Sequence, residues 1–148
     1  MKILAKNKRA TFDYEILETF EAAPSLLGCE VKSVKAGRVS LDNSFANFKG
    51  GDLYLLNAHI PAWQPKNAPL DYEASRSRRL LLHKKELKYL LGKIREARLT
   101  LIPLAFVLKN NKIKVELGLG KSRRKIDKRE VIRERETQRE INRRMKGD

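Results

Sequence analysis

The sequence predicts a mainly β fold in which five to six antiparallel strands, flanked by about three helices, form a small barrel. Three observations predict it. Segments of alternating apolar and polar residues are separated by turns rich in glycine, asparagine and proline. A leucine-rich segment with helical periodicity lies between the third and fourth strands. The last 28 residues are strongly basic and poor in apolar residues, so we expect a body over residues 1–120 and a tail over residues 121–148.

The first predicted strand covers residues 12–21, which read FDYEILETFE. Apolar and polar side chains alternate along it, as they do in a strand that buries one face. Leu17 and Glu18 are the two positions that break this alternation.

A helix is predicted next, over residues 25–38. Leu27, Val31 and Val34 recur there at the spacing of one helical face. Gly37 suits the left-handed residue that commonly follows the last helical turn.

Two further strands are predicted over residues 44–48 and 53–60, joined by a glycine-rich turn. The second strand is expected to turn four side chains to one face: Tyr54, Leu56, Ala58 and Ile60. Residues 61–79 contain three prolines and a basic cluster, so we expect a long loop, and long loops in compact domains are usually functional or mobile.

The strongest helical pattern lies in residues 80–97, where the segment from Leu80 to Leu82 is expected to pack at the start of the helix. Four side chains recur at helical spacing: Leu87, Leu90, Leu91 and Ile94. A nearly continuous apolar run over residues 99–108 and a clean alternation over residues 113–119 predict the last two strands, with Pro103 indicating an edge or bulge.

Five strands with a helix between the third and fourth is the order of an OB-type barrel, a fold that often binds oligonucleotides. A helix-flanked open sheet has the same order and stays an alternative.

The charge is the clearest functional signal. The formal net charge is +15, and the tail carries 12 Lys or Arg against 6 Asp or Glu, which leaves +9 for residues 1–120. Such a protein is expected to bind a polyanion, either nucleic acid or an anionic surface. No apolar run is long enough to span a bilayer, and no signal peptide or metal-binding cysteine set is visible beside the lone Cys29. We therefore expect a cytoplasmic protein without a metal or another cofactor.

Catalysis finds little support in the sequence. His59 and His83 lie in no motif that contains a nucleophile. Four acidic residues lie close together in the first strand, and they suggest either a divalent-metal site or the solvated face of that strand: Asp13, Glu15, Glu18 and Glu21.

Binding to RNA is better supported, because basic residues form several clusters that can contact phosphates. The candidate contacts are Lys8, Arg9, Lys32, Lys35, Arg38, Arg76, Arg78, Arg79, Lys84 and Lys85, with Lys88 beside them. Aromatic residues are few and fall mostly on core positions, which favours folded RNA read by its shape and backbone.

The tail is predicted to be disordered in isolation and helical when docked. Asp127 with Glu130 forms a capping-box variant, and Glu136 with Arg139 and Glu140 with Arg143 are pairs on one helical face. These contributions are small, so the helix needs an anionic partner. An inert solubilising tail is the alternative.

Several segments resemble the small protein B (SmpB) family, the partner of transfer-messenger RNA (tmRNA). They are NKRA at 7–10, ETFEA at 18–22, GCEVKSVKAGRVSL at 28–41, RSRRLLLHKKEL at 76–87 and IDKRE at 126–130. Each motif alone is weak, but together and in this order they are highly specific.

The resemblance implies an OB-type barrel with three helices and a monomeric RNA-binding protein that is not an enzyme. Such a protein binds the tRNA-like domain of tmRNA and helps deliver it to ribosomes stalled on truncated mRNA. The tail is expected to lie as a helix in the vacant mRNA channel near the decoding centre. Elongation factor Tu is implied as an indirect partner.

The resemblance also carries over residue roles. Asn7, Glu21 and Leu81 match RNA-binding positions, and for Leu81 a purely packing role is equally open. The tail positions that match are Lys121, Arg123, Arg124, Asp127, Lys128 and Arg129. The sequence departs from the family at Ile126, where a histidine or tyrosine is frequent, so an apolar contact would have to replace a stacking contact.

Two other functions stay open at the level of sequence. One is a general basic RNA-binding or ribosome-associated OB protein. The other is a metal-dependent nuclease that uses the acidic first strand.

Overall fold

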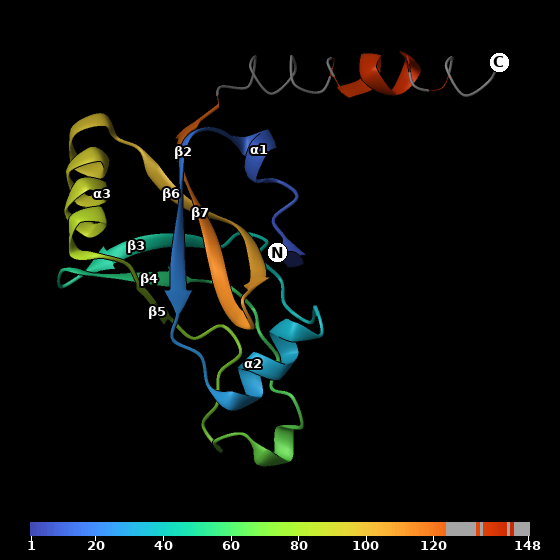
Figure 1. Cartoon of the computed structure of the whole chain (residues 1–148), viewed down its shortest axis with the longest axis vertical. Helices are drawn as coiled ribbons and strands as arrows, with labels where there is room; N and C mark the ends of the chain where they lie inside the picture. Colours follow the sequence, from blue (N-terminus) through green and yellow to red (C-terminus); the bar gives the residue numbers. More distant parts are fainter. Residues whose placement is uncertain (124–132, 134, 142, 144–148) are drawn as a thin grey trace.

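A computed structural model describes residues 1–123, 133, 135–141 and 143 (Figure 1). In this part of the chain, helices lie between some of the strands of one antiparallel sheet. The elements are β1 (Lys2–Lys6), α1 (Ala10–Asp13), β2 (Tyr14–Pro24), α2 (Gly28–Lys35), β3 (Phe45–Lys49), β4 (Asp52–Leu56), the 3-10 helix η1 (Pro65–Asn67), β5 (Arg78–Leu81), α3 (Lys84–Ala97), β6 (Thr100–Lys109) and β7 (Lys112–Ser122).

The strands pair in the order β1-β6-β3-β4-β5-β2-β7, and β7 pairs back with β6. Six strands therefore form a ring-like sheet, to which β1 adds on the outside of β6. This arrangement confirms the predicted mainly β antiparallel fold with flanking helices. Two pairings of the ring are short, since β3 meets β6 at one residue pair and β2 meets β5 at two.

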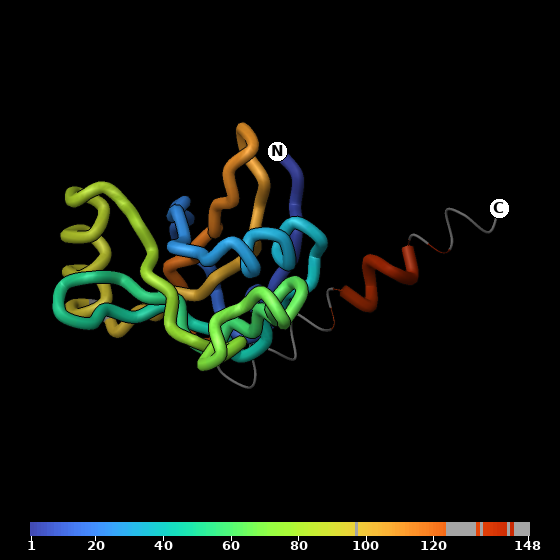
Figure 2. The backbone as a smooth tube through the Cα atoms, turned by 90° about the horizontal axis from the view of Figure 1, so that it is seen from below, coloured from blue at the N-terminus to red at the C-terminus, as the bar shows by residue number. Residues whose placement is uncertain are grey.

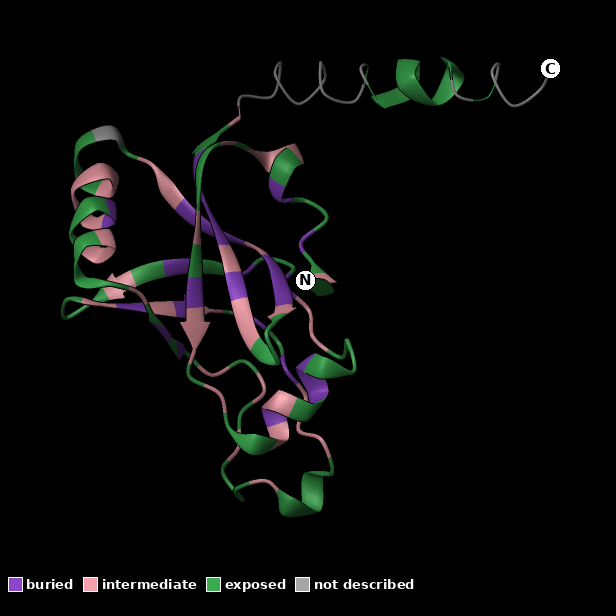
Figure 3. Ribbon diagram, in the orientation of Figure 1, coloured by how far each residue is buried: buried purple, intermediate pink, exposed green. Residues whose placement is uncertain are grey.

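The core lies inside this ring, where buried residues from successive strands meet (Figure 3). Leu53 and Leu55 of β4, Phe106 of β6 and Leu117 of β7 are all 0 % exposed. Val34 extends the same cluster to α2, so the helix is fixed to the ring by apolar packing.

The end of α2 follows the predicted pattern. Gly37 has φ of +76°, its N–H donates to the carbonyl oxygen of Val34, and the N–H of Arg38 donates to that of Ser33. This is the Schellman arrangement, in which a left-handed residue lets the chain turn back and satisfies the last helical carbonyls. Helix α3 and strands β3, β6 and β7 also lie where the sequence patterns predict them.

Several details of the prediction are wrong. Residues 2–6, which carried no strand signal, form β1, and residues 10–13 form a helical turn before β2 begins. The alternation break at Leu17 is a register shift in the pairing of β2 with β7, so Leu17 is 51 % exposed.

The burial phase predicted for the strand over residues 53–60 is also wrong. Leu53 and Leu55 are buried in β4, whereas Tyr54 and Leu56 are only partly covered. The strand ends at Leu56, and Asn57 has φ of +62°, which reverses the phase before Ala58 and Ile60 are buried.

The end of the predicted loop is a strand. Arg78 and Arg79 belong to β5, and so do Leu80 and Leu81, the first two of the three leucines that we expected to pack at the start of the helix. The helix itself begins at Lys84. The short β5 completes the ring by pairing with β4 and β2.

Strand β7 runs through Ser122, and the N–H of Arg123 donates to the carbonyl oxygen of Asp13. The division into a body over residues 1–120 and a tail over residues 121–148 stays a prediction. The described residues beyond Arg123, which are 133, 135–141 and 143, are helical and exposed. The predicted disorder of the isolated tail and the capping role of Asp127 stay predictions, since Asp127 is outside the described residues. Among the described residues, no helix is both long and apolar enough to cross a membrane.

Candidate nucleic-acid interface

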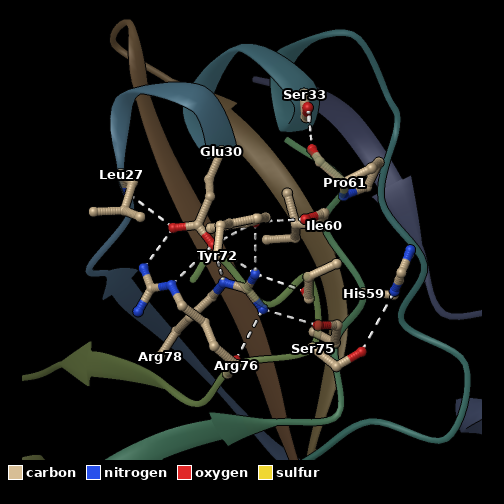
Figure 4. Close-up of polar contacts among 12 residues, drawn as sticks. Leu27, Glu30, Ser33, His59, Ile60, Pro61, Tyr72, Ser75, Arg76 and Arg78 are labelled. Atoms are coloured by element: carbon tan, nitrogen blue, oxygen red, sulfur yellow. Dashed lines mark hydrogen bonds and ion pairs between the residues drawn. The ribbon is translucent and has the colours of Figure 1, made fainter. Parts of the chain in front are cut away.

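A buried ionic network joins α2 to the long loop over residues 57–77 (Figure 4). Glu30, in the first turn of α2, is 0 % exposed and sits between two arginines. The Arg78 Nε lies 2.6 Å from Glu30 Oε2, and the Arg76 Nε lies 3.1 Å from the same oxygen. The other carboxylate oxygen accepts from the N–H of Leu27 at 2.8 Å, which caps the helix. One carboxylate thus anchors the helix start and two cationic side chains.

Arg78 uses its remaining donors on loop carbonyls. Its Nη1 donates to Ala58 at 2.8 Å and its Nη2 donates to Ala74 at 2.9 Å, so the guanidinium ties the two ends of the loop together. The Tyr72 hydroxyl lies 2.6 Å from the carbonyl oxygen of Ile60 and 3.1 Å from Glu30 Oε2. Every buried side-chain polar atom in the described residues has a partner.

Opposing effects act on the Glu30 carboxyl. Burial raises its pKa, but hydrogen bonds from Arg76 and the Leu27 amide, with the charge of Arg78, outweigh burial and hold the pKa of Glu30 below its ordinary value. Glu30 is therefore ionised, and the network is a true ion cluster. Burial, then the charge of Glu30, raises the pKa of Tyr72, so its hydroxyl stays protonated.

Two predicted RNA contacts are part of this network. Arg78 is 0 % exposed, so we remove it from the candidate contacts: it is an internal cation and not a surface one. Arg76 keeps a 30 % exposed side chain, but its donors also bind Glu30 and the carbonyl oxygen of Ser25. The basic cluster over residues 76–79 is continuous in sequence but divided in the structure. Alternate residues of β5 face opposite sides, so Arg78 points inward and Arg79 points outward.

Glu21 and Leu81 come together at a surface hollow of about 580 Å³. The hollow lies where β2 and β5 pair, with Ala23 opposite Leu81, and Lys114 of β7 and His83 also line it. Leu81 is 50 % exposed there. Glu21 has a partly exposed contact with Lys109, whose Nζ lies 3.4 Å from its Oε2. The hollow thus presents an apolar side chain beside a carboxylate and an amine.

Asn7 lies apart from this hollow and is 8 % exposed. Its side-chain amide donates to the carbonyl oxygen of Pro103, and its N–H donates to that of Leu104. These bonds hold the segment that leads into α1. Lys8 and Arg9 follow it and are exposed, with the Arg9 guanidinium 5.2 Å from the ring of Phe12.

The remaining predicted cations are exposed in two further places. Lys32 and Lys35 lie on α2 with Arg38 just beyond it, and Lys84 and Lys85 begin α3. Arg79 points outward from β5 and pairs with Asp52 at 3.1 Å. Figures 1 and 2 show α3 beside the β3–β4 hairpin at one side of the molecule, away from α2 and its neighbouring loop. The structure therefore arranges the candidate cations around the ring and not in one cluster.

The acidic residues of the first strand do not gather. Within the described residues, no group of three His, Cys, Asp or Glu side chains is placed to hold a metal ion. Glu18 instead accepts from the Tyr89 hydroxyl at 2.7 Å, and this hydrogen bond raises the pKa of Tyr89. Glu21 is engaged by Lys109, and Asp13 by Arg9 at 3.4 Å.

Of the predicted tail residues, Lys121 and Arg123 are described. Lys121 pairs with Glu15 in the β2–β7 ladder, and the Arg123 Nε donates to the carbonyl oxygen of Thr11 at 3.2 Å. The other tail residues lie outside the described residues: Arg124, Ile126, Asp127, Lys128 and Arg129.

Comparison with known proteins gives consistent results. The model of the SmpB protein family matches residues 4–147. The chain belongs to the SmpB family. An SsrA-binding protein from Thermosynechococcus vestitus is 44 % identical over 99 % of this chain and 96 % of its own length. One from Acidothermus cellulolyticus is 47 % identical over 99 % and 94 %.

A solved structure also resembles this SmpB family member. It is a chain from "tmRNA-SmpB: a journey to the center of the bacterial ribosome", with a TM-score of 0.68 and 44 % identity over 90 % of this chain and 96 % of that one. The similarity extends over most of both chains and confirms the mainly β antiparallel fold.

Two residues near the candidate interface carried no clear signal in the sequence. Glu30 is a lone acid in a basic helix, and Trp63 lies in the predicted loop, where the sequence signals are prolines and a basic cluster. Their partners are distant in sequence, so the local pattern did not indicate them. The only available signal was chemical: a lone carboxylate at the third position of a helix is a common capping residue.

Proposed function

We propose that this protein binds the tRNA-like domain of tmRNA and delivers it to ribosomes stalled on truncated mRNA, where its tail probes the empty mRNA channel. The observation that supports this most directly is the family match, which runs over residues 4–147 and so includes both the body and nearly all of the tail. The relatives bear the name SsrA-binding protein.

In this proposal, the hollow at Glu21 and Leu81 is the place where RNA is read. An exposed leucine offers an apolar surface to a ribose or base, and a carboxylate accepts from base amino groups. Around it, exposed cations contact phosphates and orient the RNA. They are Lys8, Arg9, Lys32, Lys35, Arg38, Arg79, Lys84 and Lys85, with Arg76 contributing its exposed edge. Asn7 acts indirectly, by holding the segment that presents Lys8 and Arg9.

The ribosomal part of the proposal concerns the tail. Its basic residues bind the walls of the mRNA channel, and Asp127, Lys128 and Arg129 support accommodation at the decoding centre. Ile126 makes an apolar contact there. Elongation factor Tu takes part through the RNA, and the protein acts in the cytoplasm as a single copy.

A competition experiment tests the RNA specificity. Labelled tmRNA bound to the full-length protein is challenged with unlabelled tmRNA or with ordinary tRNA at fixed salt. We expect unlabelled tmRNA to compete far better. If ordinary tRNA displaces the complex equally well, the protein is a general basic RNA-binding protein instead.

A matched pair of leucine substitutions tests the hollow. Leu81→Ala is expected to weaken tmRNA binding by roughly fivefold, as for loss of about 1 kcal/mol of apolar contact. Leu70→Ala is the control, because Leu70 is fully exposed and outside the hollow. Equal affinity of both variants would leave Leu81 with a packing role only.

A further inference from the structure

Arg38 and Trp63 form a cation–π pair between the end of α2 and the long loop. The Arg38 guanidinium carbon lies 4.8 Å from the centroid of the indole ring, within the range of a cation–π interaction. Arg38 is exposed and Trp63 is half-buried, so the ring supports the guanidinium from the protein side. The guanidinium is planar and exposed, so the face that it turns away from the indole is open to stacking by a ligand.

The pair has a rigid support. The N–H of Trp63 donates to the carbonyl oxygen of Cys29 in α2 at 3.0 Å, and the Ser33 hydroxyl donates to the carbonyl oxygen of Pro61. The Glu30 network fixes both ends of the same loop to the same helix (Figure 4). The loop is therefore held at its ends and at its middle, and Trp63 is positioned before any ligand arrives.

The helix that leads to Arg38 is cationic on its exposed side. Lys32 follows Cys29 by one helical turn, and both Lys32 and Lys35 are exposed. Glu30 is the only carboxylate within α2, and it is fully buried and neutralised by arginines. The exposed side of this helix therefore bears positive charge alone, which suits phosphates next to a stacked base.

We propose that Arg38 and Trp63 form a stacking site for one unpaired nucleobase of RNA, with Lys32 and Lys35 holding the neighbouring phosphates. Unpaired bases stack on guanidinium planes and on aromatic rings, whereas bases inside a duplex are already stacked on each other. This site is separate from the hollow at Glu21 and Leu81, whose lining includes neither Arg38 nor Trp63. The inference rests on the proposed function only for the class of ligand, RNA.

The chain offers a direct probe, because Trp63 is its single tryptophan. Two RNAs are titrated into the full-length protein at fixed salt: a hairpin with a single-stranded loop, and a blunt duplex with the same stem sequence. Tryptophan fluorescence and binding affinity are both recorded. We expect the hairpin to change the fluorescence at saturation and the duplex to leave it nearly unchanged.

Arg38→Lys keeps the charge but removes the planar stacking surface. We expect it to weaken hairpin binding by roughly 5- to 100-fold, the range for loss of one stacked base, and to leave duplex binding within about twofold. Trp63→Leu is expected to act in the same direction. Arg95→Lys is the matched control, since Arg95 is exposed on α3 outside every proposed contact.

The proposal is overturned if saturating hairpin leaves Trp63 fluorescence unchanged and Arg38→Lys binds hairpin like the parent. It is also overturned if Arg38→Lys weakens hairpin and duplex equally, because Arg38 would then contact phosphate alone. Neither result depends on whether the protein prefers tmRNA to tRNA, so failure of this site and failure of the proposed function are distinguishable.

Discussion

Arg78 is the largest fully buried side chain among the described residues, and its charge is met by Glu30. Taking two ions out of water is costly, so such a pair adds little net stability compared with an apolar pair of the same shape. Removing one partner is different, because the other is left as an uncompensated buried charge. The main effect of the pair is therefore structural: it fixes the long loop in one position on α2.

Arg78→Ala tests this role. We expect the free energy of unfolding to fall by about 3–5 kcal/mol, because Glu30 loses a buried partner and two loop carbonyls lose their donors. Urea denaturation followed by circular dichroism gives the value. Arg79→Ala is the control, since its ion pair with Asp52 is about half exposed and should contribute less than about 1 kcal/mol. Similar losses in the two variants would contradict the structural role.

Glu30 also predicts a pH dependence. The pKa of Glu30 is lowered in the folded protein from its ordinary value of 4.5, so its contribution to stability is complete above about pH 4.5 and is lost as the pH falls through the folded value. Glu30→Gln should therefore be less stable than the parent near neutral pH, and the gap should shrink in acid. Urea denaturation between pH 3 and pH 7 measures it. If the difference in stability between the parent and Glu30→Gln stays constant below pH 4.5, the pKa of Glu30 is not lowered in the folded protein.

At the residue scale, sequence reasoning identified the cations but not their environments. Lys32, Lys35 and Arg38 were correctly placed on or just after an exposed helix, because helical periodicity separates the apolar side from the charged side. Arg78 was not, since its burial depends on Glu30, a carboxylate far away in the chain. Local pattern contains no information about such long-range pairing.

At the scale of elements, Gly37 shows how one residue type sets the direction of the chain after α2. Its φ is positive, a backbone conformation that residues with a Cβ adopt only with strain. A Cβ at this position would also lie 3.3 Å from the carbonyl oxygen of Leu4 in β1. The glycine thus serves two purposes, the helix end and the close approach of β1.

Gly37→Ala is expected to lower the free energy of unfolding by about 1–2 kcal/mol, because alanine is strained in the left-handed region. Gly92→Ala is the matched control. Gly92 lies inside α3, where a Cβ would meet nothing within 4 Å, so the substitution should raise stability by about 0.4–1 kcal/mol. Thermal or urea denaturation compares the two. A Gly37→Ala variant at least as stable as the parent would show that the turn does not require glycine.

The elements that the sequence predicted well were those with long periodic patterns. Helix α3 has 14 residues, and strands β6 and β7 have 10 and 11, so each is long enough to show a clear pattern of apolar residues. β5 has only four residues. Its two arginines belong to the predicted loop and its two leucines continue into the helical pattern that follows, so the sequence shows no separate strand there. β1 is stabilised by pairing with β6 and its outer residues are exposed, so it has no amphipathic signal of its own.

At the scale of the whole molecule, the ring of strands creates the candidate interface. β5 pairs with β2 through only two residues, yet this pairing brings Leu81 beside the strand that carries Glu21. Neither residue is close to the other in sequence, and the hollow that they share follows from ring closure. The sequence could suggest each residue through family resemblance, but their meeting depends on β5, whose residues the sequence divides between a predicted loop and a predicted helix.

The last prediction concerns the division between body and tail. β7 continues through Ser122 and Arg123 binds the carbonyl oxygens of Asp13 and Thr11, so a truncation that spares the body must end after Arg123. We expect this variant to keep the stability of the parent and to bind tmRNA within a few-fold, because the hollow and the α2 cations are intact. Peptide tagging on stalled ribosomes should be lost, because the channel-binding segment is absent.

Tagging and RNA binding must be measured on the same preparations, with the full-length protein as reference. A second variant that ends after Gly120 serves as the structural control, since it removes the β7 residues that pair with Tyr14 and Glu15 and should lose stability. If the variant ending after Arg123 still supports tagging, the tail does not sense an empty channel. If it instead loses tmRNA binding, the tail is part of the RNA interface, and the separation of roles between ring and tail is wrong.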